Sequence, residues 1–112
     1  MPRPQRLRRI CGMPVYKRFT ADGGCGENAI VLTLDEYETI RLMDHEGCTH
    51  EQCASIMKIS RTTVTEIYAS ARKKIAAMIV EGRELCLEGG RIELCEHTSE
   101  CDHTACAESC RK

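Results

Sequence analysis

The sequence is poor in aromatic residues, with no Trp, one Phe and three Tyr in 112 residues. Its core must therefore be mainly aliphatic, because aromatic side chains supply the largest single contributions to most cores. It also has no run of roughly 20 apolar residues, the length that crosses a bilayer. Its basic N-terminus is not followed by an apolar stretch, so it does not resemble a secretory signal. We therefore expect a small cytoplasmic domain without a membrane partner.

Cysteine, in contrast, is abundant, with nine residues. An odd number cannot pair fully within one chain, and no export signal points to an oxidising compartment. Under reducing conditions, metal binding or redox sensing explains so many thiols better than a disulfide framework does.

The net charge of −1 conceals a strong segregation of charge along the chain. Residues 1–20 carry six basic and no acidic side chains, and residues 61–74 carry four basic and one acidic. Residues 21–47 and 84–112 are acidic overall. Binding to an acidic polymer requires local rather than global positive charge. Charge alone, however, leaves an ordinary solvated surface as an equal alternative.

Local signals predict three helices in the middle of the chain. Capping-box spacing relates Thr33 to Glu36 and Thr49 to Gln52, and Ser60 is a good N-cap. The predicted helices cover residues 34–46, 50–57 and 61–81, and they end at Gly47, at the turn 58–59 and at Gly82. Helical spacing predicts one buried face on the third helix, formed by Val64, Ile67, Tyr68, Ala71, Ile75, Met78 and Ile79.

These signals predict a mainly α fold, in which a three-helix helix-turn-helix domain carries a short strand element and a small Cys/His-rich tail. A basic arm covers residues 1–29, with a short strand over residues 15–19. The helix-turn-helix domain covers residues 30–90 and includes a second candidate strand over residues 84–88, and Gly89 and Gly90 separate it from the tail, residues 91–112.

A short helix, a tight turn and an N-capped longer helix together suggest DNA binding by the third helix. Arg can form paired hydrogen bonds with guanine, while Thr can contact a phosphate, a base edge or the thymine methyl group. An ordinary three-helix bundle with a polar surface is the alternative. The candidate DNA-contacting residues are Arg61, Thr62, Thr63, Thr65, Glu66, Arg72, Lys73 and Lys74, together with Arg3, Arg6, Arg8 and Arg9 of the arm.

Several separated sequence blocks also resemble one prokaryotic family. They are Pro2-Arg3-Pro4, Arg8-Arg9-Ile10-Cys11, Val31-Leu32-Thr33-Leu34-Asp35-Glu36-Tyr37-Glu38, Ile40-Arg41-Leu42, Glu46-Gly47, Ser60-Arg61-Thr62-Thr63 and Ser70-Ala71-Arg72-Lys73-Lys74-Ile75-Ala76. Over residues 1 to about 90 the chain resembles the family called domain of unknown function 134, or uncharacterised protein family 0251. The resemblance implies a helix-turn-helix similar to region 4 of bacterial sigma factors, with a recognition helix that starts over residues 60–66.

The tail concentrates six metal-ligand side chains in sixteen residues and contains the near-repeat Cys-x-His-Thr. Four sulfurs, or three sulfurs and one His, could close a tetrahedral zinc site, so zinc is the favoured metal. An iron–sulfur cluster is also possible, because thiolates suit it as well. A tail of reactive thiols without metal is the alternative. The candidate ligands are Cys95, Cys101, Cys106 and Cys110, with His97 and His103 as substitutes.

The other cysteines give weaker signals. We expect Cys53 to be a small buried apolar residue and Cys48 to be structural, while Cys11, Cys25 and Cys86 have no assigned role. No nucleophile–base pair or phosphate-binding glycine loop is visible, so no enzyme is predicted.

The function predicted from the sequence is a DNA-binding transcriptional regulator whose tail cysteines respond to metal or redox state. Its expected partner is double-stranded DNA, and a homodimer or a contact with the transcription machinery is left open. The alternative is a metal-carrying or iron–sulfur accessory protein whose helices bind a protein partner.

Overall fold

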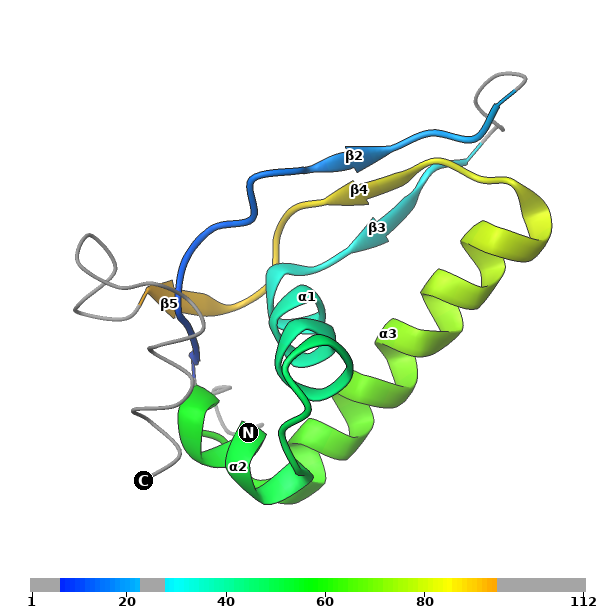
Figure 1. Cartoon of the computed structure of the whole chain (residues 1–112). Helices are drawn as coiled ribbons and strands as arrows, with labels where there is room; N and C mark the ends of the chain where they lie inside the picture. The colour runs from blue at the N-terminus through cyan, green and yellow to red at the C-terminus, as the bar shows by residue number, and fades with distance from the viewer. Residues whose placement is uncertain (1–6, 23–27, 95–112) are drawn as a thin grey trace, which may run out of the picture.

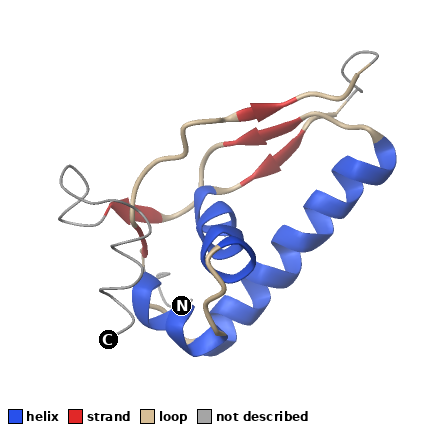
Figure 2. Cartoon of the chain, viewed as in Figure 1, coloured by secondary structure: helices blue, strands red, loops and turns tan. Residues whose placement is uncertain are grey.

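The computed structural model describes residues 7–22 and 28–94, and it is a mixed α/β fold in which helices predominate (Figures 1 and 2). The sequence predicts short strands over residues 15–19 and 84–88, and the described residues form five strands in two sheets, with β4 inside the second predicted range. In chain order, the elements are β1 (Arg8–Ile10), β2 (Arg18–Phe19), β3 (Ile30–Leu32), α1 (Leu34–Ile40), the π-helical turn η1 (Arg41–His45), α2 (His50–Met57), α3 (Arg61–Glu81), β4 (Leu85–Leu87) and β5 (Ile92–Leu94).

The two sheets join parts of the chain that are far apart in sequence. In the three-stranded sheet, β4 lies in the centre, antiparallel to β2 and parallel to β3. In Figure 1 this sheet converges with the C-terminal end of α3, and α1 lies between the two. The second sheet is a parallel pair of β1 and β5, with Arg8 opposite Ile92. The described fold therefore continues past Gly90 to β5.

The helix signals in the sequence agree closely with the structure. Thr49 and Gln52 form a complete capping box at the start of α2, and the Ser60 hydroxyl accepts a hydrogen bond from the backbone N–H of Thr63. Gly82 ends α3 with a φ of 65°, a left-handed conformation that costs glycine little. Of the strand expected over residues 15–19, only Arg18 and Phe19 are in a strand.

The apolar face of α3 is shorter than the spacing predicted. Val64, Ile67 and Ala71 are buried, but Ile79 is 70% exposed. The reason is that α1 and β3 pack against α3 without covering the side on which Ile79 lies, and this side borders an open hollow with Phe19 and Arg83. Periodicity identifies a stripe, but the packed neighbours decide how much of it is buried.

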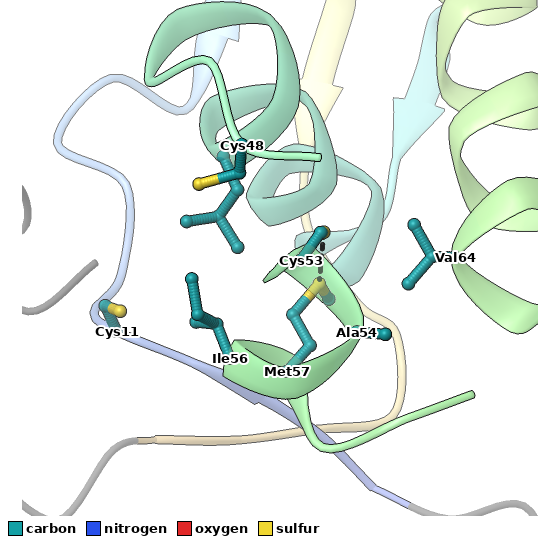
Figure 3. Packing of buried hydrophobic residues seen from close by; sticks show 8 residues of the cluster. Cys11, Cys48, Cys53, Ala54, Ile56, Met57 and Val64 are labelled. Carbon is teal, nitrogen blue, oxygen red and sulfur yellow. Dashed lines mark hydrogen bonds between the residues drawn. The ribbon is translucent and has the colours of Figure 1, made fainter. Parts of the chain in front are cut away.

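Two groups of buried apolar side chains hold the fold together. One joins the C-terminal part of α3 and α1 to both sheets, with Ile10, Leu32, Ala71 and Leu85 among its members. The other holds α2 against α3 and against the turn before α2. Figure 3 shows this second group, whose buried members are Cys11, Leu42, Cys48, Cys53, Ala54, Ile56, Met57 and Val64.

A buried ion pair fixes the end of β1 to α1. The Glu38 carboxylate is fully buried and accepts hydrogen bonds from Nε and Nη2 of Arg41, at 2.8 and 3.0 Å, and from the backbone N–H of Cys11 at 2.8 Å. Burial alone would lower the pKa of Arg41, but these bonds to Glu38 raise it. Removing either partner would leave a buried charge uncompensated, which is strongly destabilising.

Candidate nucleic-acid interface

The turn between α2 and α3 is fixed by backbone hydrogen bonds. Lys58 is left-handed, with a φ of 58°, and its N–H donates to the carbonyl oxygens of Ala54 and Ser55. The N–H of Ile59 donates to the same Ala54 oxygen at 3.0 Å. Ala54 and Val64 are buried between the two helices (Figure 3), so the angle between α2 and α3 is set by close packing.

The first turns of α3 present polar side chains to solvent. Arg61, Thr62, Thr65 and Glu66, all candidate DNA-contacting residues, are exposed. Thr63 is different, since it is half-buried and its hydroxyl lies 2.8 Å from that of the N-cap Ser60. Thr63 therefore supports the cap rather than extending from the surface.

Arg61 is the most prominent cation at this end of α3. Its side chain is 67% exposed, and its Nη1 lies 3.8 Å from the Glu51 carboxylate, which is itself 80% exposed. An exposed pair at this distance contributes about 0–1 kcal/mol. A ligand with a fixed acceptor could therefore displace Glu51 at little cost.

A second cation, Arg72, is positioned by neighbouring polar side chains. Its Nη1 donates to the Tyr68 hydroxyl at 3.0 Å, and that hydroxyl donates to Asp44 at 2.7 Å. The hydrogen bond to Asp44 raises the pKa of Tyr68, because it stabilises the protonated phenol. Lys73 follows Arg72 on α3 and is exposed.

Lys74 has a different environment from the one expected of a phosphate-binding residue. Its ammonium donates to Glu36 Oε1 at 2.6 Å and to the Val31 carbonyl oxygen at 2.8 Å. Glu36 is 5% exposed, and burial would raise its pKa. Hydrogen bonds from Lys74, the Ser70 hydroxyl and the Thr33 N–H outweigh that effect, so the pKa of Glu36 is lowered. Lys74 thus connects α3 to the start of α1.

Two candidate DNA-contacting cations of the arm, Arg8 and Arg9, are also engaged within the fold. Arg8 Nε lies 3.8 Å from the Asp35 carboxylate, and both side chains are largely buried. Arg9 Nε donates to the Ile56 carbonyl oxygen near the end of α2, at 2.7 Å. Arg3 and Arg6 lie outside the described residues. Arg8 and Arg9 of β1 therefore attach the arm to α1 and α2.

Lys58 is an exposed cation that was predicted to lie in the turn but was not among the candidate DNA-contacting residues. It lies in the turn between α2 and α3, three residues before Arg61. A basic residue in the turn of a predicted helix-turn-helix is a signal that could have identified it.

The candidate metal ligands of the tail, from Cys95 to Cys110, lie outside the described residues, as does Cys25. Over residues 7–22 and 28–94, no three Cys, His, Asp or Glu side chains come together as a metal site would require. Cys11, Cys48 and Cys53 are buried in the apolar group of Figure 3. Burial, with the nearby Cys48 and Glu38, raises the pKa of Cys53 to about 12. This matches the expectation that Cys53 behaves as a small apolar residue.

No helix in the described part of the chain is long and apolar enough to cross a membrane.

Comparisons with known proteins agree on one family. Its sequence model, described as a protein of unknown function, DUF134, matches residues 1–95. A UPF0251 protein of Desulfitobacterium hafniense strain Y51 is 45% identical over 114 residues, covering 100% of this chain and 88% of the relative. A UPF0251 protein of Methanothermobacter thermautotrophicus is 46% identical over 90 residues, covering 80% of this chain and 48% of the relative. No solved structure matches this chain. The chain therefore belongs to the DUF134 family, whose curated members carry the name UPF0251.

Proposed function

We propose that this protein is a DNA-binding transcriptional regulator that inserts the N-terminal end of α3 into the major groove. The observation that carries the proposal is the exposed row of Arg61, Thr62 and Thr65 on an N-capped helix. α2 supports this helix through a rigid, hydrogen-bonded turn. This is the arrangement in which helix-turn-helix proteins present a recognition helix.

The side chains in this row suit base reading. Arg61 can donate two hydrogen bonds to guanine O6 and N7, and its partner Glu51 is exposed and readily displaced. The methyl groups of Thr62 and Thr65 can contact thymine. The Thr65 hydroxyl donates to the Arg61 carbonyl oxygen at 3.1 Å, which orients that methyl group.

We assign the phosphate contacts to exposed cations that come before and after Arg61, Thr62 and Thr65 in the sequence. Lys58 lies in the turn before α3, and Arg72 and Lys73 lie further along α3. Arg72 bonds to Tyr68 but keeps 63% of its side chain exposed, whereas Lys74, Arg8 and Arg9 are at least partly buried in their intramolecular bonds, so we assign those three to the fold. The exposed cations are few, and the proposal therefore predicts modest affinity from each copy of the protein.

The tail supplies the regulatory part of the proposal. Its cysteines would hold zinc, or an iron–sulfur cluster, as thiolates, and the same thiolates are the groups that oxidants attack. β5 ends at Leu94, immediately before Cys95, and pairs with β1. β1 carries Arg9, which bonds to Ile56 in α2. A change in the tail therefore has a short covalent and hydrogen-bonded route to the helix-turn-helix.

The DNA part is tested by fluorescence anisotropy on a pool of genomic fragments across a salt series. If Lys58, Arg72 and Lys73 each neutralise one phosphate, the slope of log K against log salt should be about −2.7 per bound copy. Lys73→Met should reduce the magnitude of this slope by about 0.9. Lys17→Met is the matched control, because Lys17 is also exposed but precedes β2. No binding at low salt, or equal effects of the two substitutions, would contradict the proposal.

The metal part is tested by elemental analysis and a visible spectrum after purification without chelator. Cys101→Ser should lower the metal content more than His97→Ala, because thiolates are the expected primary ligands. If the protein binds metal, passes it to an acceptor and has no DNA affinity, the metal-carrying accessory protein is the better interpretation.

A further inference from the structure

An apolar groove of about 480 Å³ opens between the segment that leads into β2 and the helices α1 and α3. Its walls come from elements far apart in sequence, and nearly all of the lining is aliphatic or aromatic. Representative lining residues are Met13, Tyr16, Phe19, Tyr37, Met78 and Leu87. A smaller hollow of about 250 Å³ shares Phe19 and Met78 with it and adds Ile79. The two hollows therefore form one continuous apolar face.

Apolar side chains also project from this face. Val15 is 84% exposed, Tyr16 is 74% exposed and Ile79 is 70% exposed. Val15 and Tyr16 line the groove, whereas Ile79 lines only the smaller hollow, so a small molecule inside the groove would leave Ile79 in water. Covering all three side chains requires a surface of protein size, because exposed apolar patches of this kind mark sites of macromolecular contact.

The sequence outside the described ranges offers little apolar surface for this face. The residues outside the described ranges, 1–6, 23–27 and 95–112, contain no Leu, Ile, Val, Phe, Tyr or Trp. They therefore have no large apolar side chain besides Met1 with which to fill a hollow of this size.

We infer that this face is the contact surface between two copies of the chain, related by a two-fold axis. A two-fold interface requires one patch that is complementary to itself. Here a projecting side chain, Ile79, and an unfilled groove lie on the same face, so each copy can place its projection in the hollow of the other. The charges beside the face occur as pairs of opposite sign, Arg18 with Glu84 at 3.1 Å and Arg83 with Glu81 at 3.4 Å. Such pairs allow like surfaces to meet without net repulsion.

This interface leaves the proposed DNA surface free. The face involves the C-terminal part of α3, while Arg61 lies at the other end of the same 21-residue helix (Figure 1). At 1.5 Å per residue the two ends are roughly 30 Å apart. The inference does not depend on DNA binding, since self-association can be measured without DNA.

The test is sedimentation equilibrium of the full chain under reducing conditions, which prevent disulfide-linked dimers, from about 1 to 100 μM. Wild-type protein should sediment at twice the monomer mass. Ile79→Glu should weaken the dimer at least about tenfold, because it places a carboxylate in an apolar contact. Tyr16→Glu, in the segment that leads into β2, should also weaken the dimer. Val80→Glu is the matched control, since Val80 is 82% exposed on α3 and lines neither hollow.

All these side chains are exposed, so circular dichroism should give a folded spectrum for every variant. A wild type that stays monomeric at 100 μM overturns the inference. So does a dimer that tolerates both Ile79→Glu and Tyr16→Glu, or one that Val80→Glu weakens as much as Ile79→Glu. A monomer that binds an apolar dye in the groove would instead indicate a small-molecule site.

Discussion

Lys74 and Lys73 are adjacent on α3 but should behave as different kinds of residue. Lys74→Met removes the cation that bonds to Glu36 and leaves a carboxylate whose side chain is 7% exposed without its main partner. A hydrogen bond to a charged group contributes about 1.5–3 kcal/mol. Lys74 is itself 33% exposed, so solvent screening reduces this contribution to about 1–2 kcal/mol. At roughly 4 °C per kcal/mol, Tm should fall by about 4–8 °C.

The stability that Lys74→Met loses should depend on pH in a predictable direction. In the wild type the pKa of Glu36 is lowered from its ordinary value of 4.5, so the stability contributed by the carboxylate is present above that value. It is lost as the pH falls through the folded-state pKa. In Lys74→Met, burial should raise the pKa of Glu36 instead, and the charged form then destabilises the fold at neutral pH. The stability difference between wild type and variant should therefore be largest at pH 7 and narrow towards pH 3.

Urea denaturation at pH 7, 5 and 3 measures this difference. Lys73→Met is the matched control, because Lys73 is exposed and its loss should change stability by less than about 0.5 kcal/mol. Lys73→Met should weaken DNA binding, while Lys74→Met, assayed well below its Tm, should not. A Lys74→Met protein that is as stable as wild type but binds DNA less well would refute the assignment of Lys74 to the fold.

Three other outcomes are expected. Arg61→Ala should reduce discrimination between cognate and random DNA by roughly 1–3 kcal/mol in competition anisotropy, with an unchanged Tm, because an exposed side chain that reads bases has little role in the fold. Truncation after Leu94 should remove most bound metal while circular dichroism retains the helical signal, since β5 and its pairing with β1 are kept; full metal retention would place the site elsewhere. Native protein at pH 8 should resist iodoacetamide at Cys53, whose pKa is about 12, and mass spectrometry should detect its alkylation only after unfolding.

The helices could be predicted because their signals are local. Thr49 and Gln52 are three residues apart, Ser60 directly precedes α3, and Gly82 directly follows it. Each signal acts within one turn of helix, so a single sequence contains all the information needed. The bounds of α2 and α3 therefore agree with the prediction residue for residue.

The sequence predicted a strand over residues 84–88, which contains β4, but β1, β3 and β5 were missed because each has only three residues and a distant partner. Arg8 pairs with Ile92 across most of the chain, and Ile30 pairs with Leu85. A three-residue strand is too short for apolar and polar residues to alternate recognisably. β5 is one example: it follows Gly89 and Gly90, which are both in left-handed conformations, and its partner β1 lies at the other end of the described chain.

The charged residues illustrate a different limit. Lys73 and Lys74 are identical in type and adjacent in sequence, yet one is exposed and the other bonds to Glu36 on α1. Helical geometry alone separates them by about 100°, but the direction that faces α1 depends on how the two helices pack. Sequence therefore predicted which residues are basic and helical, and only the fold separates the cations that stabilise the domain from those that remain exposed.

The small number of exposed cations connects DNA affinity to the proposed dimer. Each copy offers few exposed cations on and before α3, so one copy alone should bind DNA weakly, while two linked copies double the phosphate contacts. The salt slope should then be about −5 for the dimer and about −2.7 for the monomeric Ile79→Glu protein. Anisotropy over a salt series, with Val80→Glu as the control, measures both slopes. Equal slopes for wild type and Ile79→Glu would mean that DNA contacts only one copy, and that the two α3 N-termini of the dimer do not act on the same duplex.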